Sequence, residues 1–187
     1  MKKSQHSNQV RIIGGQNRGR KLIFSDADGL RPTPDSVRER LFNWLGQDLA
    51  GMEVLDLFSG SGALGFEAHS RHAKHVIMID NNQQTVQNLQ QNARVLGAQV
   101  EIIQKDSLAY LTSCSSQYDL VLLDPPFAWD EWSVLFSQLE QHLKANAKVY
   151  IEAGCLPSFP AYLSPYKQGK TGQSLYVLLE NKIAVTE

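Results

Sequence analysis

The chain has 187 residues, of which 42% are hydrophobic and 20% charged, with a formal net charge of −1. This length suits a single domain with a self-sufficient core, and the composition excludes a disordered or fibrous chain. The longest apolar runs, 120–123 and 175–179, are far shorter than the roughly 18 residues of a membrane span. The N-terminal MKKSQHSNQV lacks the apolar stretch of a signal peptide, and the two cysteines form no CxxC pair. We therefore expect a cytoplasmic protein without membrane segment, disulfide framework or metal.

The charge is unevenly distributed along the chain. Residues 1–40 carry nine Lys or Arg against four Asp or Glu, a balance of +5, which leaves −6 for the remaining residues. Clustered basic side chains release counterions from nucleic-acid phosphates, so the N-terminal segment is a candidate RNA or DNA contact. A solvated basic tail would give the same count, and charge alone leaves both interpretations open.

The N-terminal segment has the pattern of a hairpin followed by a helix. Two β-type runs, 10–13 and 21–24, flank the turn-forming sequence GGQNRG, which predicts a hairpin with a basic tip. The sequence Thr33-Pro34-Asp35 has the order of an N-cap, a first helical proline and a first-turn acid. Apolar residues at helical spacing then predict an amphipathic helix over about 34–46.

From residue 53 onward, short apolar strands alternate with amphipathic helices. We expect strands over 54–57, 76–79, 100–103, 120–123 and 148–152, and helices over 63–71, 82–96, 107–113 and 131–143. Runs 166–168 and 174–180 around GKTG predict a C-terminal antiparallel hairpin. This order predicts a Rossmann-like three-layer α/β sandwich with a mostly parallel sheet. We divide the chain into a basic hairpin extension, 1–30, and a catalytic domain, 31–187.

Four successive strands lead into an aspartate, in order Asp56, Asp80, Asp106 and Asp124. Ligands of an open parallel sheet bind at the carboxyl ends of the strands, so these carboxylates should meet at one edge. A carboxylate is costly to bury without a partner, so the set favours a ligand with hydroxyls, an amine or positive charge. Any one of the four could alone be a helix cap.

The loop after the first of these strands contains Gly60, Gly62 and Gly65, which match G-x-G-x-x-G. The glycines alone would fit a dinucleotide such as NAD. Asp56, just before them, disfavours a pyrophosphate and suits the ammonium and sulfonium groups of S-adenosylmethionine.

The tetrapeptide Asp124-Pro125-Pro126-Phe127 follows a later strand. Two prolines restrict the backbone and remove two donors, which leaves a rigid group of carboxylate, carbonyls and aromatic ring. Such a group suits the exocyclic amine of a nucleic-acid base. The alternative is a turn that ends a strand and buries a core phenylalanine.

Together with the N-terminal sequences RIIGG, RGRKL and LRPTPDSVRE, these motifs resemble the RsmD family over nearly the whole chain. That family comprises class I S-adenosylmethionine-dependent 16S rRNA (guanine(966)-N(2))-methyltransferases. The resemblance implies methylation of a guanine N2 in 16S rRNA, as naked RNA or in the small ribosomal subunit or its assembly intermediate, by a monomer. His72 stands where that family is expected to have glycine.

The resemblance also implies roles for individual residues. Asp124 and the Pro125 carbonyl would bind the amine, and Phe127 would stack on the unpaired base. Asp56 would hold the amino group of the cofactor, Asp80 its ribose and Asp106 its adenine. The cofactor-binding set is Asp56, Ser59, Gly60, Gly62, Asp80, Asp106, Ser107 and Thr33, where Thr33 would reach the methionine carboxylate. The basic side chains expected to contact RNA phosphates are Arg11, Arg18, Arg20, Lys21 and Arg31.

Three alternatives remain at this point. The DPPF motif also fits a DNA adenine-N6 or cytosine-N4 methyltransferase, although the chain is short for a separate base-reading domain. The glycine loop fits a nicotinamide-dependent oxidoreductase, which Asp56 disfavours. A non-catalytic RNA-binding protein on a Rossmann-like scaffold would keep the basic segment but would not need all four carboxylates.

Overall fold

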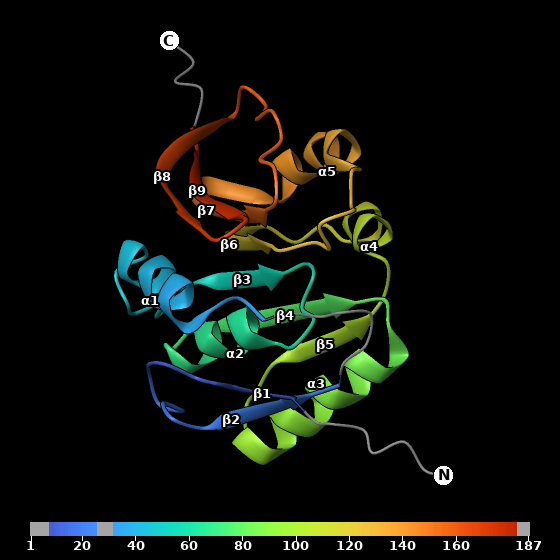
Figure 1. The fold of residues 1–187 in the computed structure, drawn as a ribbon. Helices are drawn as coiled ribbons and strands as arrows, with labels where there is room; N and C mark the ends of the chain where they lie inside the picture. Colours follow the sequence, from blue (N-terminus) through green and yellow to red (C-terminus); the bar gives the residue numbers. More distant parts are fainter. Residues whose placement is uncertain (1–7, 26–31, 183–187) are drawn as a thin grey trace.

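A computed structural model describes residues 8–25 and 32–182, so Arg31 lies outside the described residues. It contains a seven-stranded sheet in the order β5-β4-β3-β6-β7-β9-β8 and a separate two-stranded sheet, β1-β2. Figure 1 shows this strand order running across the molecule, with the β1–β2 hairpin beside α3.

Five strands of the large sheet are parallel, as the alternation of strands and helices predicts. They are β3 Glu53–Asp56, β4 His75–Asp80, β5 Glu101–Gln104, β6 Tyr118–Leu123 and β7 Leu143–Ala153. The last strand, β9 Ser174–Asn181, pairs antiparallel with β7 and with β8 Leu163–Thr171. The predicted mixed α/β fold with its C-terminal antiparallel hairpin is confirmed.

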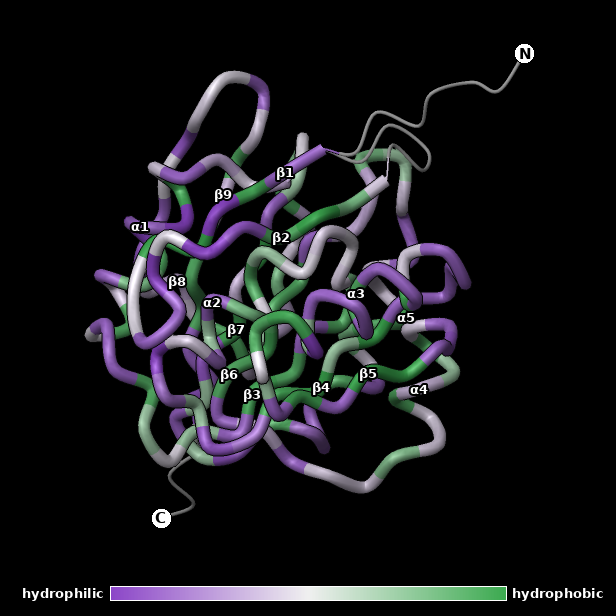
Figure 2. The backbone as a smooth tube through the Cα atoms, turned by 90° about the horizontal axis from the view of Figure 1, so that it is seen from below, coloured by the Kyte–Doolittle hydropathy of each residue, from purple (hydrophilic) through white to green (hydrophobic). Residues whose placement is uncertain are grey.

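Helices cover both faces of the sheet. Neighbouring strand residues such as Val54 and Leu55 are buried in different core clusters, because successive side chains of a strand point to opposite faces. One cluster contains side chains of α1 Asp35–Trp44, α2 Ala63–Ser70 and α3 Gln83–Leu96, and the other those of α4 Ser107–Ser113 and α5 Trp132–Leu139. Each fully buried leucine or isoleucine contributes roughly 1.5–3 kcal/mol. Figure 2 shows the hydrophobic central strands surrounded by hydrophilic loops.

Two predicted boundaries near the C-terminus are wrong. The helix predicted over 131–143 ends at Leu139 and is followed by a 3₁₀ turn, Glu140–His142, and β7 then begins at Leu143. Leu135, Leu139 and Leu143 repeat at helical spacing, but Leu143 is buried by pairing with Tyr118 of β6. The strand predicted over 166–168 is longer, because the edge strand β8 accommodates Pro165 at a register shift.

The N-terminal hairpin, β1 Asn8–Arg11 and β2 Lys21–Phe24, shares the core of the large domain. Four apolar side chains are buried in the cluster that also contains α2 and α3 residues, namely Val10, Ile12, Leu22 and Phe24. On α3, the side chain of Asn92 accepts from the Ile23 N–H at 3.0 Å and donates to the Ile23 carbonyl at 2.8 Å. The hairpin is therefore packed as part of the domain.

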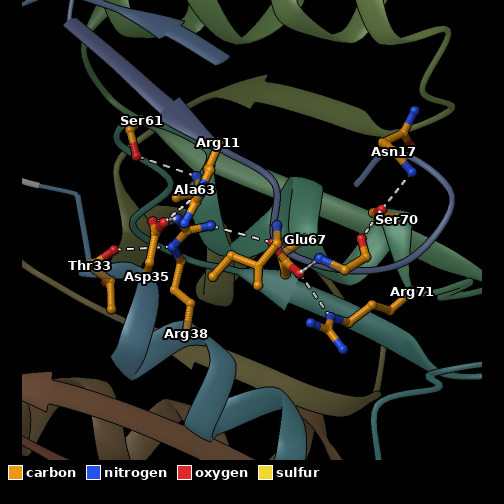
Figure 3. A network of polar contacts seen from close by, with 12 residues as sticks. Arg11, Asn17, Thr33, Asp35, Arg38, Ser61, Ala63, Glu67, Ser70 and Arg71 are labelled. Carbon is orange, nitrogen blue, oxygen red and sulfur yellow. Dashed lines mark hydrogen bonds and ion pairs between the residues drawn. The ribbon is translucent and has the colours of Figure 1, made fainter. Parts of the chain in front are cut away.

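Glu67 of α2 fixes the connection between the hairpin and the domain (Figure 3). Its fully buried carboxylate accepts the backbone N–H groups of Ile13 and Gly14, both at 2.8 Å. The same carboxylate pairs with Arg71 at 2.9 Å and with Arg38 of α1 at 3.3 Å. Burial lowers the pKa of Arg38, and the nearby Glu67 and Asp35 oppose this effect. None of the helices in residues 8–25 and 32–182 is long and apolar enough to cross a membrane.

Candidate active site

The carboxyl ends of β3, β4, β6 and β7 form one edge of the sheet, and the strand order reverses between the parallel neighbours β3 and β6. Such a change in strand order opens a crevice for ligands. Asp56 ends β3 beside this crevice and is only 1% exposed. Its Oδ2 accepts the Gly65 N–H at 3.0 Å, whereas its buried Oδ1 has no hydrogen-bond partner among the described residues. Burial, helped by the charge of Asp80, raises the pKa of Asp56 to about 7.

Asp80 holds the glycine loop against the end of β4. Its Oδ2 accepts the Gly60 N–H at 3.0 Å and its Oδ1 accepts the Asn82 N–H at 2.9 Å. Burial raises the pKa of Asp80, and the hydrogen bonds from these two N–H groups act in the opposite direction. Buried Ser59 closes the loop, because its hydroxyl donates to the Asp56 carbonyl at 3.0 Å. The structure thus brings Asp56, Ser59, Gly60 and Asp80 together.

Close packing explains why the other two positions of the motif, Gly62 and Gly65, are glycine. Gly62 has a φ of 79°, and a Cβ at this position would lie 2.6 Å from Leu89 and 2.7 Å from Phe66. A Cβ at Gly65 would lie 2.8 Å from Met78 and 2.9 Å from the Asp56 carboxylate. Glycine is therefore required here by the left-handed turn and by close packing of α2.

Asp106 and Ser107 begin α4, at the end of β5. The exposed Asp106 caps this helix, because its Oδ1 accepts the Ala109 N–H at 2.9 Å. Ser107 is buried as the first helical residue. Asp106 thus has the capping role that a single acid after a strand can have, and its predicted contact with adenine stays a prediction.

The DPPF segment places a polar group and an aromatic ring at the end of β6. Asp124 and Pro125 directly follow the last residue of β6. The Pro126 carbonyl accepts the Trp129 N–H at 2.8 Å. Phe127 is 68% exposed, which contradicts the alternative of a core phenylalanine. Its ring faces Gly154 after β7, where a Cβ would lie 3.9 Å from it.

Thr33 lies beside Asp124, and with it lies a carboxylate that the sequence analysis missed. The Thr33 hydroxyl is 3.2 Å from Asp124 Oδ2 and 3.0 Å from Oε2 of Glu152, a buried residue of β7. Burial and the charge of Glu152 raise the pKa of Asp124 well above its usual range. The only signal in the sequence was another acid near the end of an apolar strand. The predicted contact of Thr33 with a methionine carboxylate would have to form beside two acids.

The basic residues of the hairpin differ in their surroundings. Arg11 pairs with Asp35 at 2.6 Å, and Arg20 donates to the Val95 carbonyl at 2.8 Å, near the end of α3. The exposed side chains of Arg18 and Lys21 make no hydrogen bond or ion pair with any residue in 8–25 and 32–182. A hollow of about 390 Å³ separates the hairpin from segment 32–35, and its lining comprises Gln9, Val10, Arg11, Lys21, Pro32, Thr33, Pro34 and Asp35.

Comparison with known proteins identifies the family of this chain. Residues 10–180 match the family model described as conserved hypothetical protein 95. The chain belongs to this family. It is 38% identical over 190 residues to ribosomal RNA small subunit methyltransferase D of Escherichia coli (strain K12), covering 97% of this chain and 96% of that relative. The protein of the same name from Haemophilus influenzae is 43% identical over 162 residues, covering 81% and 84% of the two chains.

A solved structure agrees with these sequence relatives. The putative methyltransferase yhhF from Escherichia coli superposes with a TM-score of 0.85 at 37% identity, covering 94% of this chain and 99% of that one. The match to the model of the conserved hypothetical protein 95 family begins within the hairpin and extends over the large sheet. The family resemblance expected from the DPPF and N-terminal motifs is confirmed.

The residues present fit the cofactor that the resemblance implies, S-adenosylmethionine. Its ammonium group needs an anionic acceptor, and the unpartnered Oδ1 of Asp56 is a buried acceptor at the carboxyl end of β3. Its ribose hydroxyls need acceptors beside the glycine loop, where the Asp80 carboxylate lies. Among residues 8–25 and 32–182, no three His, Cys, Asp or Glu side chains gather in a way that could hold a metal ion.

Proposed function

We propose that this chain transfers a methyl group from S-adenosylmethionine to the exocyclic N2 of a guanine in 16S rRNA, of the guanine-966 type. The names of the E. coli and H. influenzae relatives support the class of reaction and of RNA. The buried Asp56 carboxylate supports a cationic cofactor, since a pyrophosphate beside it would be repelled.

The observation that carries the proposal is the position of Asp124 and Phe127 at the end of β6, next to β3 and its Asp56. An exposed ring next to a carboxylate suits a flat base whose amine points at the carboxylate. The Asp124 carboxylate and the Pro125 carbonyl accept the two N–H groups of the amine. These bonds strengthen as positive charge develops on nitrogen, which stabilises the transition state.

When bound, S-adenosylmethionine supplies a methyl group that its sulfonium has already activated. The protein therefore has to align the amine with that methyl group and accept one proton. Asp124 would take the proton that the substrate nitrogen loses on methylation. A base inside a helix cannot reach this segment, so the target guanine is unpaired or flipped out.

Exposed basic side chains of the hairpin contribute to RNA binding. Arg18 and Lys21 are the candidates for direct phosphate contact, and the hollow beside Lys21 leads to Thr33 at the site. Phosphate contacts bind irrespective of sequence, so they would position the RNA while the DPPF segment reads the base.

The proposal is tested by mass mapping of 16S rRNA from cells with and without the gene. The expected result is loss of one N2-methylguanine, which purified chain and S-adenosylmethionine restore to the RNA or to the small subunit in vitro. Asp124→Ala should abolish transfer but leave the affinity for S-adenosylhomocysteine near that of the wild type. An unchanged methylation pattern, or tight binding of NADH without binding of S-adenosylhomocysteine, would overturn the proposal.

A further inference from the structure

Glu152 is a buried acid near the end of β7, the strand next to the one that carries Asp124. It is 5% exposed, and three hydroxyl groups lie against its carboxylate. Ser174 donates at 2.7 Å to Oε1, and Tyr150 and Thr33 lie at 3.0 Å from Oε2. Both carboxylate oxygens of this buried side chain therefore have hydroxyl partners.

The Thr33 hydroxyl joins this acid to Asp124. It lies 3.0 Å from Glu152 and 3.2 Å from Asp124. A hydroxyl has one proton, so it donates to one of the two carboxylates at a time. Ser174 and Tyr150 also donate to Glu152, whereas Asp124 has only its share of the Thr33 proton.

No cation compensates this pair within the part of the chain that the structure describes. The charged or titratable groups that face Asp124 are Glu152 and Tyr150 on β7 and Asp56 on β3. Arg38 comes near, but its Nε donates to the Thr33 carbonyl and its other nitrogens pair with Asp35 and Glu67. Asp124 shares one hydroxyl with Glu152, which has two further hydroxyl partners. A proton added to the pair therefore binds to Asp124. The raised pKa of Asp124 agrees with this arrangement.

We infer that Glu152 is a positioning residue for methyl transfer: its negative charge, beside Asp124 and on the other side of the shared Thr33 hydroxyl, makes Asp124 a stronger acceptor of the substrate proton. The inference rests on the proposed function. In the step concerned, the N–C bond forms, the C–S electron pair stays on sulfur, and one N–H proton passes to ionised Asp124. Proton transfer is favoured when the acceptor has a high proton affinity, and Glu152 supplies this without touching the base.

The test compares Glu152→Gln with the wild type. The glutamine keeps the size of the side chain and removes its charge. Single-turnover methyl transfer to 16S rRNA is measured against pH with saturating S-adenosylmethionine. The acid limb should move to lower pH by roughly one to three units, and the plateau rate should fall, with the affinity for RNA unchanged. A matched control is Glu180→Gln, which removes a charge paired with Lys148, at the opposite end of the β7–β9 ladder from Glu152, and should leave the limb in place.

A second measurement needs neither RNA nor cofactor. Carboxyl ¹³C NMR of the ligand-free chain follows the titration of Asp124, whose signal is identified by its loss in Asp124→Asn. Its midpoint should fall in Glu152→Gln by a similar amount. In Thr33→Val it should rise, because the hydroxyl that stabilises the ionised form is lost, and Thr33→Ser should restore it.

The Asp124 midpoint should thus fall in Glu152→Gln and rise in Thr33→Val. A merely structural disturbance of the site would not shift it in opposite directions. If Glu152→Gln fails to melt cooperatively, Ser174→Ala decides: Glu152 then loses one donor and draws the Thr33 proton from Asp124, so the Asp124 midpoint should rise. An Asp124 midpoint and acid limb that stay at the wild-type values in the folded variants would overturn the role of Glu152. Absence of any methyl transfer to 16S rRNA by the wild-type chain, with a normal NMR coupling, would overturn the proposed function instead.

Discussion

Replacing Glu67 by glutamine keeps the shape of a fully buried side chain and removes its charge. Arg38 and Arg71 then lose their common carboxylate, and the Ile13 and Gly14 N–H groups lose a charged acceptor. Breaking a buried ion pair from one side costs about 3–5 kcal/mol, because a buried charge is left uncompensated. A domain has roughly 5–15 kcal/mol in total, so this single change should remove a large part of its stability.

Urea denaturation followed by tryptophan fluorescence measures this loss. With a slope of about 2.5 kcal/mol per molar urea, the midpoint of Glu67→Gln should fall by roughly 1–2 M. The control is Glu53→Gln, which breaks the pair with exposed Lys74 and should cost at most about 1 kcal/mol. Hydrogen exchange should show lost protection at the Ile13 and Gly14 amides before the rest of the core. If Glu67→Gln matches the control, the buried network does not hold the hairpin and the reasoning fails.

Three other outcomes are expected. Because the pKa of Asp56 is about 7 in the ligand-free chain, the affinity for S-adenosylmethionine should rise about tenfold from pH 6 to pH 8, as the acid ionises, and calorimetry should show a flat profile in Asp56→Asn. His72 has a φ of 70°, so His72→Gly should raise the thermal midpoint by roughly 2–4 °C, whereas His72→Ala, which keeps the strain, should not. Arg18→Ala with Lys21→Ala should lower the slope of log affinity for RNA against log salt by roughly 0.7–0.9 per lost phosphate contact; an unchanged slope would remove both from the interface.

The parts of the fold that follow from local pattern could be predicted from the sequence. Strands that run into an acid, a glycine loop after the first of them, and the DPPF segment all depend on neighbours in the chain, and the structure has these elements where the pattern indicates. The end of α5 could not be found this way, since Leu139 and Leu143 keep helical spacing across the boundary. Only the pairing of Leu143 with Tyr118 decides it.

Contacts between distant segments could not be predicted from the sequence for the same reason. Thr33 and Glu152 are 119 residues apart, so no periodicity links them. Glu67 lies in a helix that is buried along most of its length, and the sequence shows nothing of the arginines and backbone groups around it. His72 stands where the resemblance leads us to expect glycine, and its φ of 70° gives the physical reason, since glycine adopts this left-handed conformation most readily.

The way in which the hairpin is attached limits how it can be exchanged between proteins. Its turn packs against the end of α2, where a Cβ on Gly15 would lie 1.8 Å from the Ser70 carbonyl oxygen. Its second strand has its free edge bound by Asn92. A hairpin grafted onto another Rossmann-like domain would therefore need matching partners on two helices of the recipient. Recombination within this family should accordingly carry the hairpin together with α2 and α3, and chimaeras that split them should fold poorly.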